Sequence, residues 1–174
     1  LKEGSTRMEN EKVSRTVTVT PVERPARKLI LKRTVHATDY FSMCEEIGCD
    51  WEGIFNSIPE KLDTYAGLDL PPEFIMPGTG SLAFGVEVPL DYAKPIPSGC
   101  DVIDLPPCTM LYFVGATYED ENDFGASISI VREAMSKYKP EQFGWKYAPE
   151  LSPKLHFSSE PKTGTRMAVP VRKA

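Results

Sequence analysis

The sequence has few of the residues and motifs from which metal and catalytic sites are built. Its 174 residues include two histidines and four cysteines, and the cysteines form no CxxC pair. This pattern argues against a zinc site. The phosphate loop, the dinucleotide-binding GxGxxG, the nucleophile-elbow GxSxG and the HExxH motif are all missing. We therefore expect no metal and no cofactor, and we find no residue pattern that is typical of a nucleophilic catalytic site.

An excess of positive charge and a long apolar run are also missing. Lys and Arg number 20 against 25 Asp and Glu, a net charge of −5, whereas nucleic-acid-binding domains normally display a basic surface. No apolar run approaches the ~20 residues that cross a bilayer. With no secretion signal in view, we expect a cytoplasmic chain with reduced thiols, no membrane partner and no DNA contact of its own.

An internal repeat is the strongest pattern that is present. LPPEFIMPGTGSLAFGVEVP (70–89) and LSPKLHFSSEPKTGTRMAVP (151–170) align without a gap at an offset of 81 residues. A weaker match at an offset of 82 pairs Leu29 with Leu111 and Leu31 with Phe113. The repeat predicts two similar units, about 16–92 and 100–173, that complete one core together.

Each unit reads as strand, helix, strand, strand. In the first unit, residues 16–35 favour a strand bent at Pro21 and Pro25, and Thr38 or Asp39 can cap a helix that Gly48 interrupts. LPPEFIMPG and SLAFGVEVP predict a hairpin, which LHFSSEP and TRMAVPV repeat in the second unit. The predicted fold class is α+β: two pseudo-symmetric units form an antiparallel sheet, with helices on one face and a ligand groove on the other.

Strand alternation assigns side chains to these two faces. We place Leu29 and Leu31 under the helices. The predicted groove residues come from four strands and from the loop after the second helix: Ile30, Glu87, Tyr112, His156, Trp145 and Tyr147. A concave surface with aromatic rings and one carboxylate suits a hydrophobic organic ligand, and Glu87 in an apolar hollow favours a cation.

Glu87 has a simpler interpretation as well. A carboxylate on a strand is often a solvated residue of an outer face or a partner of a nearby lysine, and alternation alone does not decide between these roles. The second copy of the repeat has Ala168 where the first has Glu87. This difference raises the question of whether only one half has a binding site.

Several segments together resemble a known family. TPVERPARKLIL, GVEVPLDY, DLPPCTMLYFVGATY, FGWKYAPE and PVRK resemble the GyrI-like effector-binding domain, which occurs alone and as the ligand-sensing half of AraC-type and MerR-type bacterial transcription regulators. The resemblance covers about residues 16–173. It implies a ligand groove between the two units, on the face away from the helices, with Glu87 at the family's acidic position. Where many members have a second acidic residue, this chain has His156.

The resemblance also implies how such a domain is used. The charged residues 1–15 are similar to the linker that follows an AraC-type helix-turn-helix domain, although an ordinary chain terminus explains them equally well. On the first interpretation the chain contacts DNA only through a missing N-terminal domain, and a homodimer is left open. Two alternatives remain: a hydrolase of electrophilic cyclopropane-type toxins, with Tyr112 or His156 assisting Glu87, and a haem-binding or partner-binding protein.

Overall fold

A computed structural model describes residues 13–174, so most of the predicted linker lies outside the described residues. The strands are β1 (Val17–Arg24), β2 (Arg27–Arg33), β3 (Ala66–Asp69), β4 (Leu82–Pro89), β5 (Asp101–Leu105), β6 (Cys108–Gly115), β7 (Trp145–Tyr147), β8 (Lys154–Phe157) and β9 (Arg166–Lys173). The α-helices are α2 (Tyr40–Ile47), α3 (Trp51–Asn56) and α4 (Phe124–Lys137); the 3₁₀ helices are η1 (Pro72–Phe74), η2 (Glu121–Asp123), η3 (Pro140–Phe143) and η4 (Pro149–Leu151). None of the helices in the described part is long and apolar enough to span a membrane.

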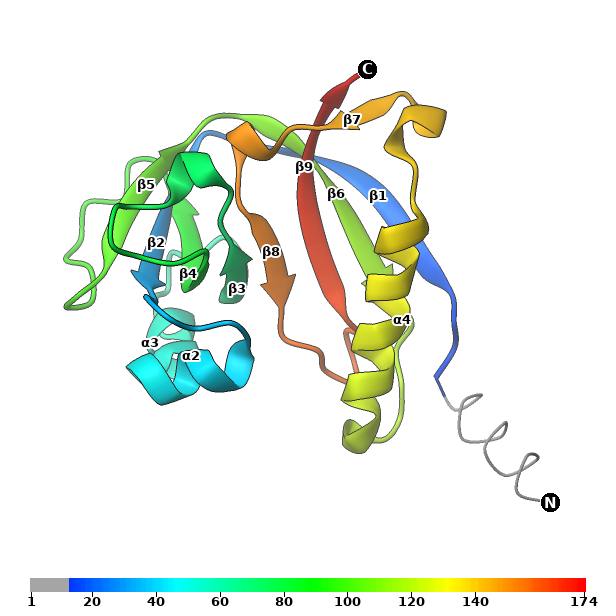
Figure 1. Ribbon diagram of the computed structural model, residues 1–174, viewed down its shortest axis with the longest axis horizontal. Coiled ribbons are helices and arrows are strands. Elements are labelled where there is room, and N and C mark those ends of the chain that lie inside the picture. Colours follow the sequence, from blue (N-terminus) through cyan, green and yellow to red (C-terminus); the bar gives the residue numbers. More distant parts are fainter. Residues whose placement is uncertain (1–12) are drawn as a thin grey trace.

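The nine strands of residues 13–174 form one antiparallel sheet in the order β1-β6-β9-β8-β3-β4-β2-β5, and β7 pairs with β9. The predicted repeat is confirmed in this order, because β2, α2 with α3, β3 and β4 make one unit and β6, α4, β8 and β9 make the other (Figure 1). The units meet where β3 pairs with β8. The α+β fold class is confirmed.

Two long, bent strands tie the units together. β1 and β2 are separated only by Pro25 and Ala26, and β5 and β6 only by Pro106 and Pro107. β1 pairs with β6 while β2 pairs with β5, and the register is unbroken from one pair to the other. The proline bend predicted near Pro25 is thus confirmed, and it lies opposite a second proline bend.

The predicted helices begin and end at their sequence signals. Asp39 caps α2, because its side chain accepts a hydrogen bond from the Ser42 N–H, and the Ser42 hydroxyl accepts one from the Asp39 N–H. Gly48 has φ = 88° and ends α2, after which α3 begins at Trp51. In the second unit α4 buries Val131 against the sheet.

Each unit has its own apolar cluster on the face that the helices cover. In the first unit Met43 of α2 and Phe55 of α3 pack on Ile30, Phe84, Val86 and Val88. In the second unit Val131 packs on Leu111, Phe113, Met167, Val169 and Val171. We call this side of the sheet the helix face.

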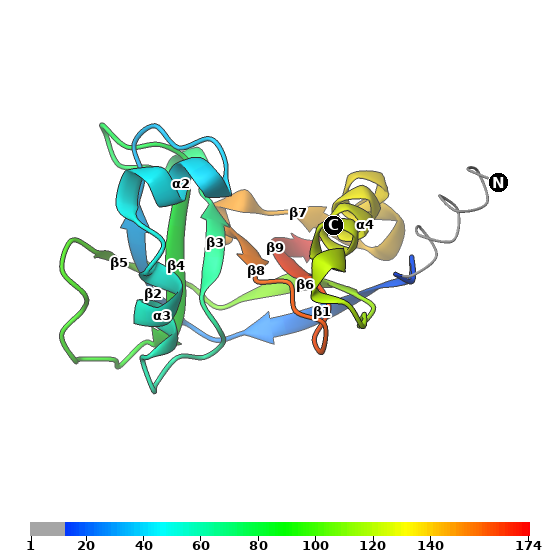
Figure 2. The ribbon, with the colours of Figure 1, turned by 90° about the horizontal axis from the view of Figure 1, so that it is seen from below.

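A third cluster lies on the opposite side, which we call the inner face. It joins side chains from seven of the strands in both units: Leu29, Leu31, Ala66, Leu68, Ala83, Leu105, Met110, Tyr112, Leu155, Phe157 and Ala168. Strands that are far apart in the sheet order can share one cluster only if the sheet is strongly curved. Figure 2 shows this curvature, with β3 and β4 running across the direction of β1 and β6.

Two predictions about the first unit are wrong. Leu29 and Leu31 lie on the inner face and Ile30 lies under the helices, the reverse of the predicted arrangement. The strand predicted at LPPEFIMPG is instead the 3₁₀ helix η1 and a loop, because paired prolines cannot supply ladder N–H groups; the strand β3 comes just before it.

Candidate functional site

The proline bend between β1 and β2 brings two arginines to the inner face. Val22 of β1 and Leu29 of β2 both pack in the inner cluster. The side chains that point to the inner face are therefore those of even-numbered residues in β1 and of odd-numbered residues in β2. Arg24 and Arg27 are three residues apart and would lie on opposite faces of a regular strand. Because the phase changes between them, both side chains reach Glu87 of β4.

Arg27 is held on all sides. Its side chain has no exposed surface, and its Nε donates a hydrogen bond to Oε2 of Glu87. Its Nη1 donates to the carbonyl oxygens of Pro25 (3.2 Å) and Pro106 (3.1 Å), one from each bend. Its Nη2 lies 3.4 Å from the Ser152 hydroxyl. Arg27 therefore satisfies carbonyl groups that the bends remove from the ladder, as well as the carboxylate.

Arg24 is held by one contact. Its Nη2 donates to Oε1 of Glu87 at 3.0 Å, and 14% of its side chain is exposed. Its Nε is buried and has no hydrogen-bond partner within residues 13–174. The two arginines thus differ: Arg27 is fixed by four groups, whereas Arg24 depends on Glu87 alone.

Glu87 itself is 4% exposed, and each of its oxygens has one arginine partner. It points to the inner face, as the sequence predicts, and it does not stand in open water. Neither simple interpretation from the sequence describes it, because its partners are two arginines rather than a lysine or solvent. The gap beside it, between Leu29, Gly85 and Phe157, is too small for a water molecule.

Aromatic rings and a second ion pair lie beside this group. The rings of Tyr112 and Phe157 stack with centroids 6.2 Å apart, and the Arg166 guanidinium lies 4.3 Å from the Phe157 ring centre. Burial raises the pKa of Tyr112 above its ordinary value, so its phenol is protonated at neutral pH. As predicted, Tyr112 lies on the same face as Glu87.

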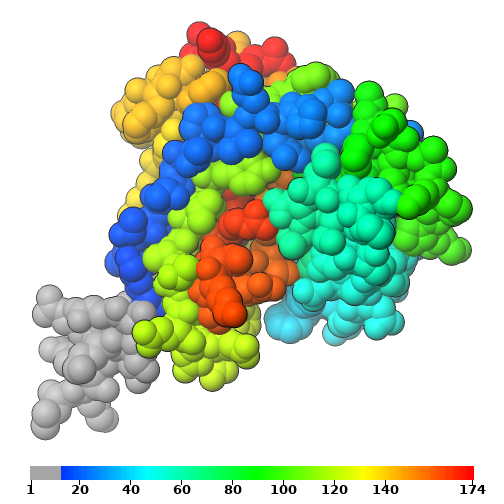
Figure 3. Space-filling model, turned by 180° about the vertical axis from the view of Figure 1, so that it is seen from behind, coloured from blue at the N-terminus to red at the C-terminus, as the bar shows by residue number. Residues whose placement is uncertain are grey.

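The second ion pair joins the two units. Arg166 of β9 donates to both carboxylate oxygens of Asp63, each at 2.9 Å, and Asp63 belongs to the segment between α3 and β3. Burial acts to raise the pKa of Asp63, but the Arg166 hydrogen bonds, the hydrogen bond from the Thr64 N–H and the charges of Arg166 and Arg24 together outweigh it and hold this pKa below its ordinary value. Figure 3, seen from the side away from α4, shows the β8–β9 hairpin between β6 and this segment.

Four of the predicted groove residues lie elsewhere. Ile30 packs under α2 and α3. Trp145 packs at the edge of the second helix-face cluster, and Tyr147 beside it is 45% exposed. Both belong to β7, which adds to β9. The predicted grouping of these residues with Glu87 is therefore wrong.

His156 is the fourth. Its neighbours Leu155 and Phe157 point to the inner face, so His156 points to the helix face, where its register partners are Gly67 and Met167. Burial lowers the pKa of His156, and the charge of Arg132 on α4 lowers it further. The ring is neutral at pH 7 and is not placed to assist Glu87 in a reaction.

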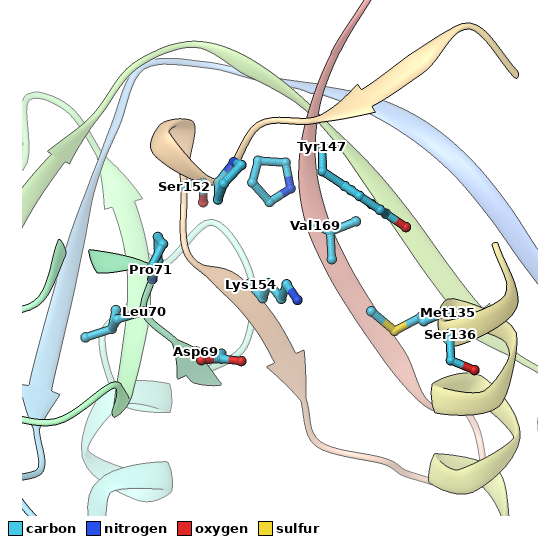
Figure 4. A pocket seen from close by; sticks show the side chains of 11 residues that line it. Asp69, Leu70, Pro71, Met135, Ser136, Tyr147, Ser152, Lys154 and Val169 are labelled. Carbon is cyan, nitrogen blue, oxygen red and sulfur yellow. The ribbon is translucent and has the colours of Figure 1, made fainter. Parts of the chain in front are cut away.

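The helix face has a larger cavity of about 500 Å³, which we call the helix-face cavity. Figure 4 shows Asp69 and Lys154 on its strand side and Met135 and Tyr147 on its α4 side. Ser152 lines it and also touches Arg27. The size is that of a site for a small organic molecule.

The arginines are the site residues that sequence reasoning missed. The available signal was the spacing Arg24-Pro25-Ala26-Arg27, in which two charges flank a proline inside a predicted strand. A proline bend can change the phase of a strand, and the two charges then need a shared counter-ion. Glu87 was the only carboxylate that alternation had placed on that face.

Comparisons with known proteins bear on the fold. No family model and no curated protein matches the sequence. The structure is similar to that of SAV2435 bound to tetraphenylphosphonium, with a TM-score of 0.54 and 14% identity over 89% of this chain and 94% of that one. This likeness shows a shared fold, and it fits the GyrI-like fold that the sequence motifs resemble.

Two further matches involve EcmrR. Its C-terminal domain matches at 16% identity and a TM-score of 0.48, over 91% of this chain and 99% of that one. EcmrR in a complex with DNA matches at 11% identity and a TM-score of 0.49, over 99% of this chain. This chain spans 64% of the length of EcmrR in that complex.

Proposed function

We propose that this chain is the ligand-sensing domain of a transcription regulator and that it binds a hydrophobic cation at the inner face beside Glu87. The observation that carries the proposal is that the two arginine partners of this buried carboxylate are fixed by different numbers of hydrogen bonds. Arg27 is locked by four groups, whereas Arg24 is partly exposed and has one partner. SAV2435, which shares the fold, is a protein whose structure holds the cation tetraphenylphosphonium.

The cation would take the place of Arg24. Glu87 cannot lose both partners, because an unpaired buried carboxylate is costly. An exchange of one cation for another leaves the charge of the site unchanged, and Arg24 regains full hydration outside. Tyr112 and Phe157 would then face the ligand, and each ring adds about 0.5–2 kcal/mol to the binding of a cation.

A ligand bound there would act on an attached DNA-binding domain. Its influence is limited by the difference between its affinities for the two states of the regulator. We retain the interpretation that residues 1–15 link this domain to such a partner and that DNA contact is made only through it. A homodimer of the regulator stays a prediction.

Titration with two hydrophobic cations tests the proposal. Tetraphenylphosphonium and 9-aminoacridine are titrated into the wild-type chain, Glu87→Gln and Asp69→Asn, after circular dichroism has shown that each variant folds. The Asp69→Asn control also removes a carboxylate, but from the helix-face cavity. We expect Glu87→Gln to weaken binding about tenfold or more, the loss of at least one charged interaction, and Asp69→Asn to leave it unchanged.

Two results would contradict the proposal. Equal affinity of wild type and Glu87→Gln would remove Glu87 from the site. A loss in Asp69→Asn alone would move the ligand to the helix-face cavity.

A further inference from the structure

In the proposed function, a cationic ligand takes the position of the Arg24 guanidinium. The hydrogen bond between Arg24 and Glu87 therefore indicates which chemical groups can bind at this position. Arg24 presents an N–H group to Oε1 of Glu87 at 3.0 Å. The other oxygen, Oε2, belongs to Arg27. The carboxylate therefore has one acceptor to offer, and the replacement that fits it best has one positive charge and at least one N–H donor.

The burial of Glu87 explains why an N–H donor is favoured at Oε1. Glu87 is 4% exposed, and the gap beside it does not admit water. If a quaternary cation displaced Arg24, Oε1 would keep a nearby charge but lose its hydrogen bond, with no water to replace it. A buried acceptor left without a donor is penalised more than the average hydrogen bond stabilises. An amidine, a guanidine or a protonated amine avoids this penalty.

The group that occupies this place, the Arg24 guanidinium, is itself flat. It lies at the end of β1, where Arg24 pairs with Cys108 of β6. Tyr112, in the same strand as Cys108, points to the same inner face. Planar delocalised cations pack on aromatic faces and match a carboxylate oxygen through N–H groups.

We infer that the Arg24 position is a subsite for N–H-bearing monocations, amidines and guanidines above all, and that Arg24 is the internal competitor that a ligand has to displace. This inference deepens the proposed function and rests on it for the larger, hydrophobic part of the ligand. It separates this chain from a site that accepts quaternary or phosphonium cations equally well. Removal of the Arg24 side chain makes the subsite available.

Chemical complementation tests the subsite directly. Arg24→Ala removes a fragment that N-ethylguanidinium replaces atom for atom, while ethyltrimethylammonium has the same charge and ethyl group but no N–H. Thermal midpoints of the whole chain are measured with each ion at increasing millimolar concentrations. We expect N-ethylguanidinium to bind Arg24→Ala roughly tenfold to a hundredfold more tightly than ethyltrimethylammonium does.

Three controls complete the design. The wild type should show no shift in this range, because its own guanidinium fills the place. Arg24→Ala/Glu87→Gln should lose the preference for N-ethylguanidinium, because the acceptor is gone. Arg172→Ala removes an arginine whose pair with Glu150 is about half exposed, and it should respond to neither ion.

Each outcome decides the inference. Equal affinity for both ions, no binding of N-ethylguanidinium by Arg24→Ala, or an unchanged preference in the double variant overturns it. If Arg24→Ala does not fold alone, refolding by N-ethylguanidinium and not by ethyltrimethylammonium supports it, and refolding by neither overturns it. A wild type that binds no hydrophobic cation would refute the proposed function and leave the complementation result standing.

Discussion

Arg27 supports a quantitative prediction about stability. Its guanidinium is fully buried and donates to Glu87, to two proline carbonyls and to Ser152. Arg27→Met keeps much of the volume and removes every one of these donors. Glu87 then has only Arg24, and the Pro25 and Pro106 carbonyls have no side-chain partner within residues 13–174.

The magnitude follows from what is left unpaired. Removal of one partner from a buried ion pair costs about 3–5 kcal/mol, and the retained Arg24 holds the carboxylate share of this loss to the lower end. Each of the two carbonyls left without a donor adds about 1–3 kcal/mol, so the total loss is about 5–9 kcal/mol. For a chain of this size that corresponds to a fall in Tm of roughly 10–36 °C.

Urea unfolding followed by tryptophan fluorescence and far-UV circular dichroism measures the free energy of unfolding. The second half of the test is Arg27→Met/Glu87→Met, which removes donor and acceptor together. We expect the double variant to be more stable than Arg27→Met, because an apolar pair leaves no buried charge. Arg172→Met, in a pair that is about half exposed, serves as the control and should change stability little.

The reasoning about Arg27 would be refuted in either of two ways. A loss below about 1 kcal/mol for Arg27→Met would mean that the buried donors are not needed. A double variant that loses the sum of the two single losses would mean that Arg27 and Glu87 do not act as a pair.

Two further predictions concern the junction between the units and one turn. Asp63 has a folded-state pKa below its ordinary value of 3.8, so its pair with Arg166 stabilises fully above about pH 4 and the benefit is lost as pH falls through the folded-state pKa. Asp63→Asn should therefore cost about 1–2 kcal/mol at pH 7 and progressively less as the pH falls below 3.8, as pH-dependent unfolding would measure; a cost that does not change with pH would contradict it. Gly164 has φ = 69°, and a Cβ there would lie 2.4 Å from the Gly115 carbonyl oxygen. Gly164→Ala should destabilise by about 2 kcal/mol or more, whereas Gly144→Ala, at φ = 82° with open space around it, should cost about 1 kcal/mol; equal losses in thermal unfolding would show that the close contact does not matter.

The architecture was predictable where local signals agree with one another. The repeat at an offset of 81 gave the two units, and it pairs Val88 with Val169, which both lie under helices. Asp39 and Gly48 set the ends of α2 because capping depends on neighbouring residues only. These features need no knowledge of the rest of the chain.

The faces of β2 were not predictable from alternation. Alternation separates the two sides of a strand, but here both sides are buried, one under α2 and α3 and one in the inner cluster. Leu29 and Ile30 are each fully buried, so hydropathy does not tell which of them faces a helix. The offset of 82 chose the wrong side, because a shift by one residue exchanges the faces of a whole strand.

The site required a feature that no periodicity contains. In a regular strand Arg24 and Arg27 point to opposite faces, and an analysis by alternation keeps them apart. Pro25 and Ala26 change the phase, and Pro106 and Pro107 do the same in the opposing strand, so that both arginines converge on Glu87. The bends that bring the charges together also take the Pro25 and Pro106 carbonyls out of the strand ladder. Arg27 is the side chain that donates hydrogen bonds to both of them. Arg27 thus also binds the backbone, and we propose that Arg24 is therefore the partner of Glu87 that a ligand replaces.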